Sequence, residues 1–172
     1  MSRSSDEKKF RLLMNQYGDC LYWHIRRIVI CREDTEDAFQ EMSIKIFRNL
    51  GSFEGDETGL KVWLYKIATN EALSSLRRKT HIFQSIDSLS PMLVTTLETE
   101  NPADEGTMEM LLQKAILELP ATQRLTFNLR YFDEMAYEQI SAITGKSVGT
   151  LKTSYHYAAK RIEKYIKENI VL

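Results

Sequence analysis

Residues 134–162 run EMAYEQISAITGKSVGTLKTSYHYAAKRI, and this stretch decides the fold of the C-terminal part of the chain. Ile140 and Ile143 give its first part an apolar face at helical spacing. Gly145 permits the positive φ that ends a helix, and Ser147 is a good N-cap for the next one. A short helix, a glycine-containing turn and a longer basic helix form the layout of a helix-turn-helix, whose second helix can enter the major groove of DNA.

The second helix of this stretch has two chemically different faces. Apolar side chains recur at steps of three and four residues and predict one buried stripe: Val148, Leu151, Tyr155, Ala158, Ile162 and Tyr165. The opposite face carries Lys152, Thr153, His156 and Lys160. Because that face is polar and cationic, it suits a groove lined with phosphates.

Composition limits the class of protein. Of the 172 residues 43% are hydrophobic, so the chain can bury a core. Seven Gly, three Pro and the lack of sustained β-branched alternation predict an all-α protein. The sequence has no apolar run near the roughly 20 residues of a membrane span, no signal-like start and only two cysteines. We therefore expect a soluble, cytoplasmic protein.

Charge is distributed unevenly although the net charge is only −1. Residues 61–79 hold five bases and one acid, and residues 146–172 hold six bases and two acids. Between them, residues 80–113 hold six acids and no Lys or Arg. This pattern is typical of a protein that touches DNA at two places and turns acidic surface elsewhere. Each basic segment taken alone also fits an ordinary solvated helix.

The remaining periodicity predicts two small helical domains. Helices are expected over 6–30, with a break near Gly18, and over 34–50, 60–78, 108–119 and 121–132. Three glycines within 51–59 indicate a loop. Residues 80–106 lose periodicity, contain Pro91 and Pro102, and are acidic. We expect a flexible linker there, joining a domain over 1–79 to one over 107–172.

The helix expected over 60–78 has a polar side that could hold nucleic acid. Its polar side chains recur at helical spacing and continue into a basic end: Lys66, Asn70, Ser74, Arg77 and Arg78. Cations beside aromatic rings bind backbone phosphate and stack on exposed bases of single strands. Trp63 fits such a role, and it fits ordinary core packing equally well.

The helix expected over 34–50 begins with acids that favour its dipole, so stability alone could explain them. Asp37, Gln40, Glu41 and Lys45 nevertheless continue a polar face beyond the first turn, and this face could dock on a partner helix.

No catalytic or cofactor motif is apparent in the sequence. Cys20 and His24 lie one helical turn apart, with Cys31 nearby, but a fourth metal ligand is not evident and free cysteines are commonly just buried. We therefore expect no enzymatic activity, no cofactor and no metal.

Four segments, in order and correctly spaced, carry a resemblance to a known family. The first is DTEDAFQE at 34–41, which is similar to the family's DAEDLVQE, and the second is WLYKIATN at 63–70 with LRR at 76–78, which is similar to WLYRIARN…LRR. The third is LELP at 117–120 with QR at 123–124 and LRYF at 129–132, which is similar to LxxLPxxxR…LRYF. The fourth is YEQI at 137–140 with SVGTLK at 147–152, which is similar to YxEIA…SVGTVKSR. Together they resemble the extracytoplasmic-function (ECF) group of bacterial RNA polymerase sigma factors over nearly the whole chain.

The resemblance implies a promoter-specificity subunit of RNA polymerase that recognises minus-ten and minus-thirty-five elements. Region two would dock the 34–50 helix on the β′ clamp helices through Asp37, Gln40, Glu41 and Lys45. The 51–79 segment would bind the minus-ten element, and the last helix would bind the minus-thirty-five element through Lys152, Thr153, His156, Tyr157 and Lys160. Region four would also meet the β flap, and the linker would run towards the RNA exit channel. Whether an anti-sigma factor binds this chain stays open.

The chain departs from the family pattern in its last helix. Where the family has the arginines of SRLHRAR, this sequence has Ser154, Tyr157 and Ala159. Because Arg makes the commonest bidentate contact to guanine, we expect weaker or altered minus-thirty-five recognition. The acids of the 51–59 loop, Glu54, Asp56 and Glu57, should point away from phosphate or contact base edges.

Two other functions remain open from the sequence. A helix-turn-helix regulator that acts without core polymerase would leave the polar face of the 34–50 helix unexplained. A helical scaffold protein would make both basic faces merely solvated, and it would show no dependence on promoter DNA.

Overall fold

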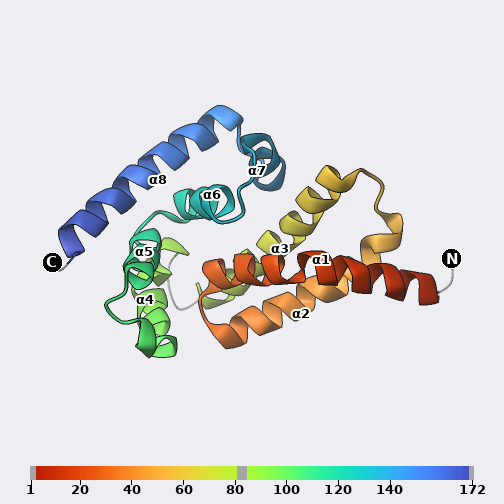
Figure 1. Cartoon of the computed structure of the whole chain (residues 1–172), viewed down its shortest axis with the longest axis horizontal. Coiled ribbons are helices and arrows are strands. Elements are labelled where there is room, and N and C mark those ends of the chain that lie inside the picture. The colour runs from red at the N-terminus through yellow and green to blue at the C-terminus, as the bar shows by residue number, and fades with distance from the viewer. Residues whose placement is uncertain (1–2, 81–84, 171–172) are drawn as a thin grey trace. The chain divides into compact units, whose positions relative to one another are not determined.

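The computed structural model of the chain describes residues 3–80 and 85–170, and within these residues it contains helices and no strands. The chain divides into two compact units, residues 1–75 and 76–172 (Figure 1). The all-α architecture predicted from the sequence is therefore confirmed. Within the described ranges, no helix is both long enough and apolar enough to cross a membrane.

The first unit is built from three long helices: α1 (Arg3–Val29), α2 (Arg32–Asn49) and α3 (Glu57–Lys79), the last of which continues into the second unit. A short 3-10 turn, η1 (Leu50–Ser52), follows α2. α1 and α2 pack side by side (Figure 1). Their buried side chains, with those of α3, form the core: Leu21, Ile25, Met42, Ile46, Leu64 and Ala68.

The predicted break in the first helix is wrong, because α1 runs through Gly18 without interruption. Gly18 is buried, and the turns that follow it bury Leu21 and Ile25 completely. The burial of these side chains outweighs the cost of about 1 kcal/mol that a glycine imposes inside a helix.

The second unit contains α4 (Ser90–Glu100), α5 (Met108–Leu117), α6 (Ala121–Tyr131), α7 (Tyr137–Thr144) and α8 (Val148–Asn169), with 3-10 turns η2 (Asp87–Leu89) and η3 (Pro102–Asp104). α8 packs against α5, α6 and α7 (Figure 1). The core beneath it consists of Ala115, Ile116, Leu119, Phe127, Ala158 and Ile162.

The described part of the expected linker is more ordered than the sequence suggests. Leu89, Leu93 and Leu97 are buried at steps of four residues, so α4 presents an apolar stripe. Pro91 lies in its first turn, where a missing N–H costs nothing, and it therefore starts the helix rather than breaking it.

Three polar contacts fix α4 and η2 to the rest of the second unit. Ser90 Oγ donates to Leu117 O at 2.5 Å, and Lys114 Nζ lies 2.8 Å from Glu98 Oε1. Asp87 Oδ1 accepts from the Ala121 N–H at 2.7 Å and so caps α6, whose own N-cap residue is a proline. Residues 87–100 are thus part of the second unit's packing.

Candidate nucleic-acid interface

The turn between α7 and α8 has the geometry that the sequence predicts. Gly145 ends α7 with a φ of 76°, and its N–H donates to Ser141 O. The Ser147 hydroxyl caps α8 by accepting from the Thr150 N–H at 3.1 Å. The Ser141 hydroxyl donates to Lys146 O at 2.6 Å and ties the turn back to α7. These contacts fix the direction in which α8 leaves the turn.

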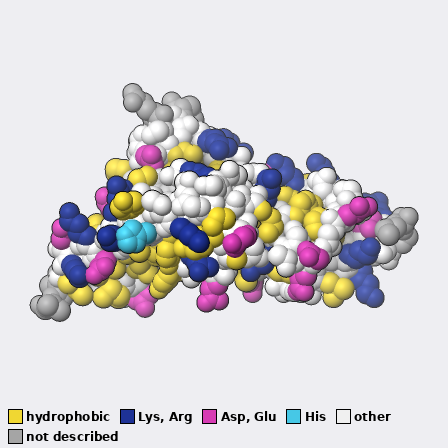
Figure 2. Space-filling view, turned by 90° about the horizontal axis from the view of Figure 1, so that it is seen from above, with side chains coloured by type: hydrophobic (Ala, Val, Ile, Leu, Met, Phe, Trp, Pro, Cys, Tyr) yellow, Lys and Arg dark blue, Asp and Glu magenta, His cyan; other side chains and the backbone are white. Residues whose placement is uncertain are grey.

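α8 buries one side and exposes the other, as predicted. Leu151, Ala158 and Ile162 are buried, while Val148, Tyr155 and Tyr165 are half-buried. The five residues expected to bind the minus-thirty-five element are all exposed, and we call them the reading face: Lys152, Thr153, His156, Tyr157 and Lys160. Tyr157 retains 53% of its accessible surface. On the side of the molecule drawn in Figure 2, Lys and Arg side chains alternate with acidic and apolar ones.

A column of aromatic rings supports α8 from α6. The rings of Tyr131, Phe127 and Tyr155 stack in sequence, with centroid separations of 5.0 and 5.6 Å. Tyr137 of α7 meets Tyr155 edge-on. Burial is the main cause that raises the pKa of Tyr155 above its ordinary value. The position of the reading face therefore depends on aromatic packing that links α6, α7 and α8.

Arg130 joins α6 to α7, a role that the sequence did not suggest. Its guanidinium lies 4.6 Å from the centre of the Tyr137 ring, and its Nη1 donates to Met135 O at 2.8 Å. Stacking of a guanidinium on a ring needs the two helices to be packed first, so no local sequence pattern predicts this contact.

Arg124 is buried, with 3% of its surface accessible, and lies between α5 and α6. Its Nη2 donates to Leu117 O at 3.2 Å and Leu119 O at 3.1 Å. Burial lowers the pKa of this guanidinium, and the nearby Asp87 carboxylate opposes that shift. The arginine of the QR motif thus stabilises the corner between α5 and α6 and does not face solvent.

On α2 the expected partner-binding residues do not behave alike. Asp37, Gln40 and Glu41 are exposed. Lys45 has an exposed stem, but its Nζ forms an ion pair with Glu71 of α3, whose side chain is 8% accessible. Glu71 is not recognisable from the sequence as the partner of Lys45, because residues 26 apart are brought together only by the packing of α2 on α3.

On α3 the polar residues also separate into two groups. Lys66, Asn70, Arg77 and Arg78 are exposed, and Ser74 is half-buried. Trp63 is half-buried, and its ring centroid lies 5.1 Å from that of Phe53 in the preceding loop, with the two ring planes tilted by 33°. A Cβ at Gly55 would lie 2.9 Å from Phe53 Cζ, so a larger residue there would displace the ring from its present position. Trp63 thus combines packing with partial exposure.

One acid of the loop before α3, Asp56, has a structural role. Asp56 Oδ1 accepts from the Gly59 N–H at 2.7 Å, and Asp56 O accepts from the Leu60 N–H at 2.9 Å. Asp56 therefore caps α3, and its charge favours the positive end of the helix dipole. This cap starts α3 three residues earlier than expected from periodicity.

Of the three residues considered as metal ligands, His24 makes other contacts. His24 is fully buried, its Nε2 lies 2.8 Å from Thr69 Oγ1, and its ring packs 5.1 Å from Tyr65. Cys20 is exposed and Cys31 half-buried. Throughout the described ranges, no three or more His, Cys, Asp or Glu side chains gather as a metal site.

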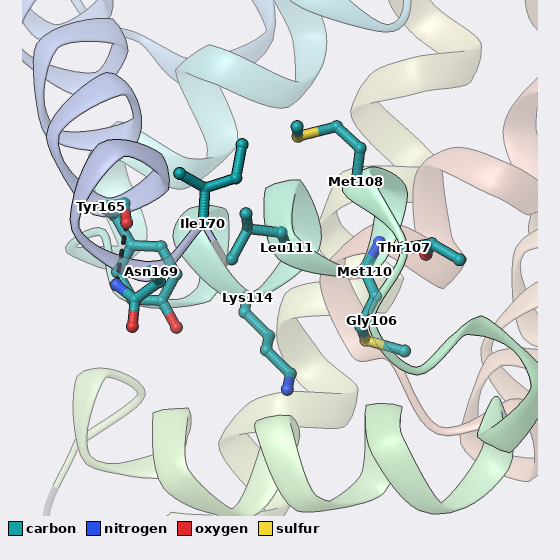
Figure 3. A pocket seen from close by; sticks show the side chains of 9 residues that line it. All are labelled: Gly106, Thr107, Met108, Met110, Leu111, Lys114, Tyr165, Asn169 and Ile170. Carbon is teal, nitrogen blue, oxygen red and sulfur yellow. Dashed lines mark hydrogen bonds between the residues drawn. The ribbon is translucent and has the colours of Figure 1, made fainter. Parts of the chain in front are cut away.

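The second unit also has a pocket of about 300 Å³ between the start of α5 and the end of α8 (Figure 3). Met108 and Ile170 on its rim are exposed, by 52% and 39%. The Lys114 side chain points from α5 towards α4, where it meets Glu98 (Figure 3). Its hydrogen bond to Glu98 raises the pKa of Lys114 above 10.5.

Comparison with known proteins finds matches for two parts of the chain, one over the first unit and one that includes the helix-turn-helix. Residues 13–82 match the family model of Sigma-70 region 2, and residues 109–162 match that of Sigma-70, region 4. The chain is 30% identical over 176 residues to the ECF RNA polymerase sigma-E factor of Haemophilus influenzae, covering 96% of this chain and 91% of that protein. It is 25% identical to the ECF RNA polymerase sigma factor SigW of Bacillus subtilis, covering 96% and 93%.

A solved structure shares the fold. The sigma factor RpoE of Bartonella quintana, crystallised with the anti-sigma factor NepR, matches with a TM-score of 0.73 over 94% of this chain and 99% of that chain, at 24% identity. Fold and site thus define a two-unit helical transcription protein with a helix-turn-helix. The chain belongs to the ECF group of the sigma-70 family. It directs promoter-specific initiation by RNA polymerase, so a regulator that acts without polymerase is not favoured.

Proposed function

We propose that this sigma factor uses three helices for three separate contacts: α2 for the β′ clamp helices of core polymerase, α3 for the minus-ten element and α8 for the minus-thirty-five element. The observation that carries the proposal is the reading face of α8, five exposed polar side chains on a helix whose start is fixed by Gly145 and Ser147. A recognition helix needs this combination of a fixed entry direction and exposed side chains.

For α2, exposure supports Asp37, Gln40 and Glu41 as the polymerase contact. Lys45 enters the proposal differently, because its ammonium is already paired with Glu71. Its contribution is to hold α2 against α3, so that the three exposed residues keep their orientation within the first unit. An interface whose supporting residues are locked by packing binds with less loss of conformational entropy.

For α3, Lys66, Asn70, Arg77 and Arg78 supply donors for phosphate and base edges, with Ser74 beside them. Trp63 offers the exposed part of its ring for stacking, while Phe53 holds the other part in place. A ring that is fixed before binding stacks on an unpaired base with little further loss of freedom.

For α8, the absence of arginine at Tyr157 predicts weak readout of the minus-thirty-five element. Tyr157 is exposed on the reading face, so Tyr157→Arg should tighten promoter binding and steepen its salt dependence by about one phosphate contact. An unchanged affinity and salt slope would place Tyr157 away from DNA. Thr153→Arg on the same face is a matched comparison, since it adds the same charge one turn earlier.

We also propose the division of labour along the chain. Region two spans 1–79, the linker 80–106 and region four 107–172. Because α4 packs on the second unit, the linker has to release this packing to run towards the RNA exit channel when polymerase is bound. The protein acts in the cytoplasm by recruiting polymerase and contributes no catalytic group of its own. Region four also meets the β flap, for which the exposed Met108 and Ile170 offer apolar surface. Because the similar Bartonella protein was crystallised with an anti-sigma factor, an anti-sigma partner is proposed here too.

The first experiment is run-off transcription with bacterial core polymerase, the purified chain and a promoter library, followed by sequencing of the transcripts. Discrete start sites preceded by two shared elements are expected. Binding of specific DNA by the free chain, with no core binding on gel filtration, would favour a polymerase-independent regulator instead.

A second experiment tests the α2 surface. The triple variant Asp37→Ala, Gln40→Ala, Glu41→Ala should lose core binding by about tenfold or more, since three contacts of an interface centre are removed together. Asp19→Ala changes an exposed acid on α1 of the same unit and serves as the control. Equal binding by both variants would contradict the placement of polymerase on α2.

A further inference from the structure

Residues 87–100, which form η2 and α4, dock on the second unit although they belong to the segment expected to be a flexible linker. We call them the latch. Leu89, Leu93 and Leu97 retain only 0%, 1% and 9% of their accessible surface, and α4 packs against α5. Full burial of one leucine side chain favours a docked arrangement by roughly tenfold or more. In the free chain, docking is therefore the stable arrangement of this segment.

Polar contacts join the latch to three points of the second unit. The Ser90 hydroxyl donates to Leu117 O at the end of α5. The Lys114 side chain points towards α4, where its Nζ lies 2.8 Å from Glu98 Oε1 (Figure 3). The Asp87 carboxylate caps α6, whose own N-cap residue is a proline and has no side-chain acceptor. Because hydrogen bonds depend on direction, these contacts hold the latch in one position.

Docking of the latch shortens the chain that joins the two units. When the latch is docked, only the seven residues 80–86 lie between α3 and η2, and they can span at most about 25 Å. When it is undocked, the 28 residues 80–107 lie between α3 and α5, and they can span up to about 100 Å. The tether between the units is therefore about four times longer in the undocked chain.

The helix of the latch depends on docking. α4 has 11 residues, and isolated helices shorter than about 12–15 residues are marginal in water. A residue that adds about 1.5 Å to the length of a helix adds more than about 3 Å to an extended chain. Undocking and extension of α4 should therefore occur together, which makes the latch an element with two discrete states.

The charge of the latch indicates what would favour its undocked state. In the docked state, Glu98 is paired with Lys114, and Asp87 accepts an N–H at the start of α6. Undocking makes both carboxylates available to another partner, and residues 80–113 contain no Lys or Arg that would compete for them. A basic surface therefore attracts the undocked latch more strongly than the docked one, and this difference in affinity is what shifts a two-state equilibrium.

We propose that the latch is an autoinhibitory contact, which keeps the tether short in the free chain and has to be released before core polymerase can be held through both units. The inference rests on the proposed function, in which the linker runs towards the RNA exit channel, and adds that docking of the latch opposes core binding. The apparent Kd for core polymerase is the intrinsic Kd divided by the undocked fraction. A latch that is docked in about nine of ten molecules would therefore weaken core binding about tenfold.

The first test locks the latch in its docked state. In a chain that carries Cys20→Ser and Cys31→Ser, the changes Glu98→Cys and Lys114→Cys replace the ion pair with two thiols. A short bismaleimide reagent with a disulfide in its spacer then joins them. The cross-linked chain should bind core polymerase at least about tenfold more weakly and give fewer run-off transcripts, and reduction of the spacer should restore both.

A matched cross-link within one helix is the control. Lys164→Cys and Glu168→Cys replace an exposed ion pair of α8, and joining them should leave core binding unchanged. If the wild type binds core polymerase and the locked latch binds it equally well, the latch is overturned while the proposed function stands. If the wild type does not bind core polymerase, both are overturned.

A second test weakens the latch instead. Leu93→Ser removes an apolar contact of the docked state, so it should make the amides of α4 exchange faster with solvent in the free chain and tighten core binding about threefold to tenfold. Thr95→Ser, at an exposed position of the same helix, should change neither quantity. Faster exchange in α4 without tighter core binding would overturn the proposal. Circular dichroism checks that the other helices of the variant are intact.

Discussion

α3 and α8 are both long helices proposed to hold DNA, yet they are anchored in different ways. α8 is fixed by an apolar stripe, Leu151, Ala158 and Ile162, under an exposed polar face. α3 buries polar residues as well: Thr69 meets His24 of α1, and Glu71 meets Lys45 of α2. Apolar contacts depend little on the angle at which side chains meet, whereas hydrogen bonds and ion pairs fix a helix at particular points along its length.

This difference matters for what each helix is proposed to do. A recognition helix must present a whole face, and a continuous apolar stripe holds that face outward along its length. A helix that holds an unpaired base must keep a few groups in fixed places. Polar links on both sides of α3 supply that precision at Thr69 and Glu71, next to the exposed Asn70.

The largest effect should come from the apolar support of α8. Leu151 is fully buried, so Leu151→Ala should destabilise the second unit by about 3 kcal/mol through lost burial and an unfilled cavity. Urea unfolding followed by circular dichroism measures it. Both tryptophans, Trp23 and Trp63, lie in the first unit, so their fluorescence transition should not move. Thr153→Ala, on the exposed face, is the control.

Next in size is the buried acid of α3. Glu71→Ala should destabilise the first unit by about 2 kcal/mol, measured by tryptophan fluorescence during urea unfolding, because it removes the partner of Lys45 and leaves a void. Lys45→Met should cost less than Glu71→Ala, about 1 kcal/mol, since its side chain is 53% accessible. If the stability lost in the double variant Glu71→Ala, Lys45→Met equals the sum of the two single losses, the two residues act independently and the ion pair contributes nothing.

A smaller effect is expected at the start of α8. Ser147→Ala removes the hydroxyl that accepts the Thr150 N–H, which should cost about 1 kcal/mol. Hydrogen exchange should become faster at Thr150 and its neighbours, while amides in the middle of α8 stay protected. Ser147→Asp, which keeps a capping oxygen, should restore the protection. Faster exchange throughout α8 would mean that the turn supports the helix more widely than one cap.

The smallest effect concerns the ion pair that fastens α4. Lys114→Met should destabilise the second unit by about 0.5 kcal/mol at neutral pH. The hydrogen bond to Glu98 raises the pKa of Lys114 above 10.5, so its contribution is complete below that pH and disappears as the pH rises through the raised folded value. The difference between wild type and Lys114→Met in urea unfolding should therefore persist at pH 9 and shrink as the pH rises through the raised pKa of Lys114. A constant difference would assign it to packing of the lysine stem.

Much of the candidate site could be predicted from local pattern. The turn at Gly145, the cap at Ser147 and the two faces of α8 each depend on residues within a few positions of one another. The ordered helix α4 was missed although Leu89, Leu93 and Leu97 recur every four residues, because two prolines and the acidic charge favoured a linker. Proline is tolerated in the first turn of a helix, and this rule, applied to Pro91, would have predicted the start of α4.

The sequence by itself determined most of the helices, the apolar faces of those helices, the helix-turn-helix and the family, because each depends on periodicity or on short motifs. Only the tertiary structure decided that Lys45 is committed to Glu71, that His24 bonds Thr69, that Arg130 covers Tyr137 and that Asp87 caps α6. The two residues of each pair lie in different elements, so their spacing in the sequence does not predict the contact. Whether a charged side chain binds a neighbour or remains free for DNA is settled only when packing brings its partner within reach.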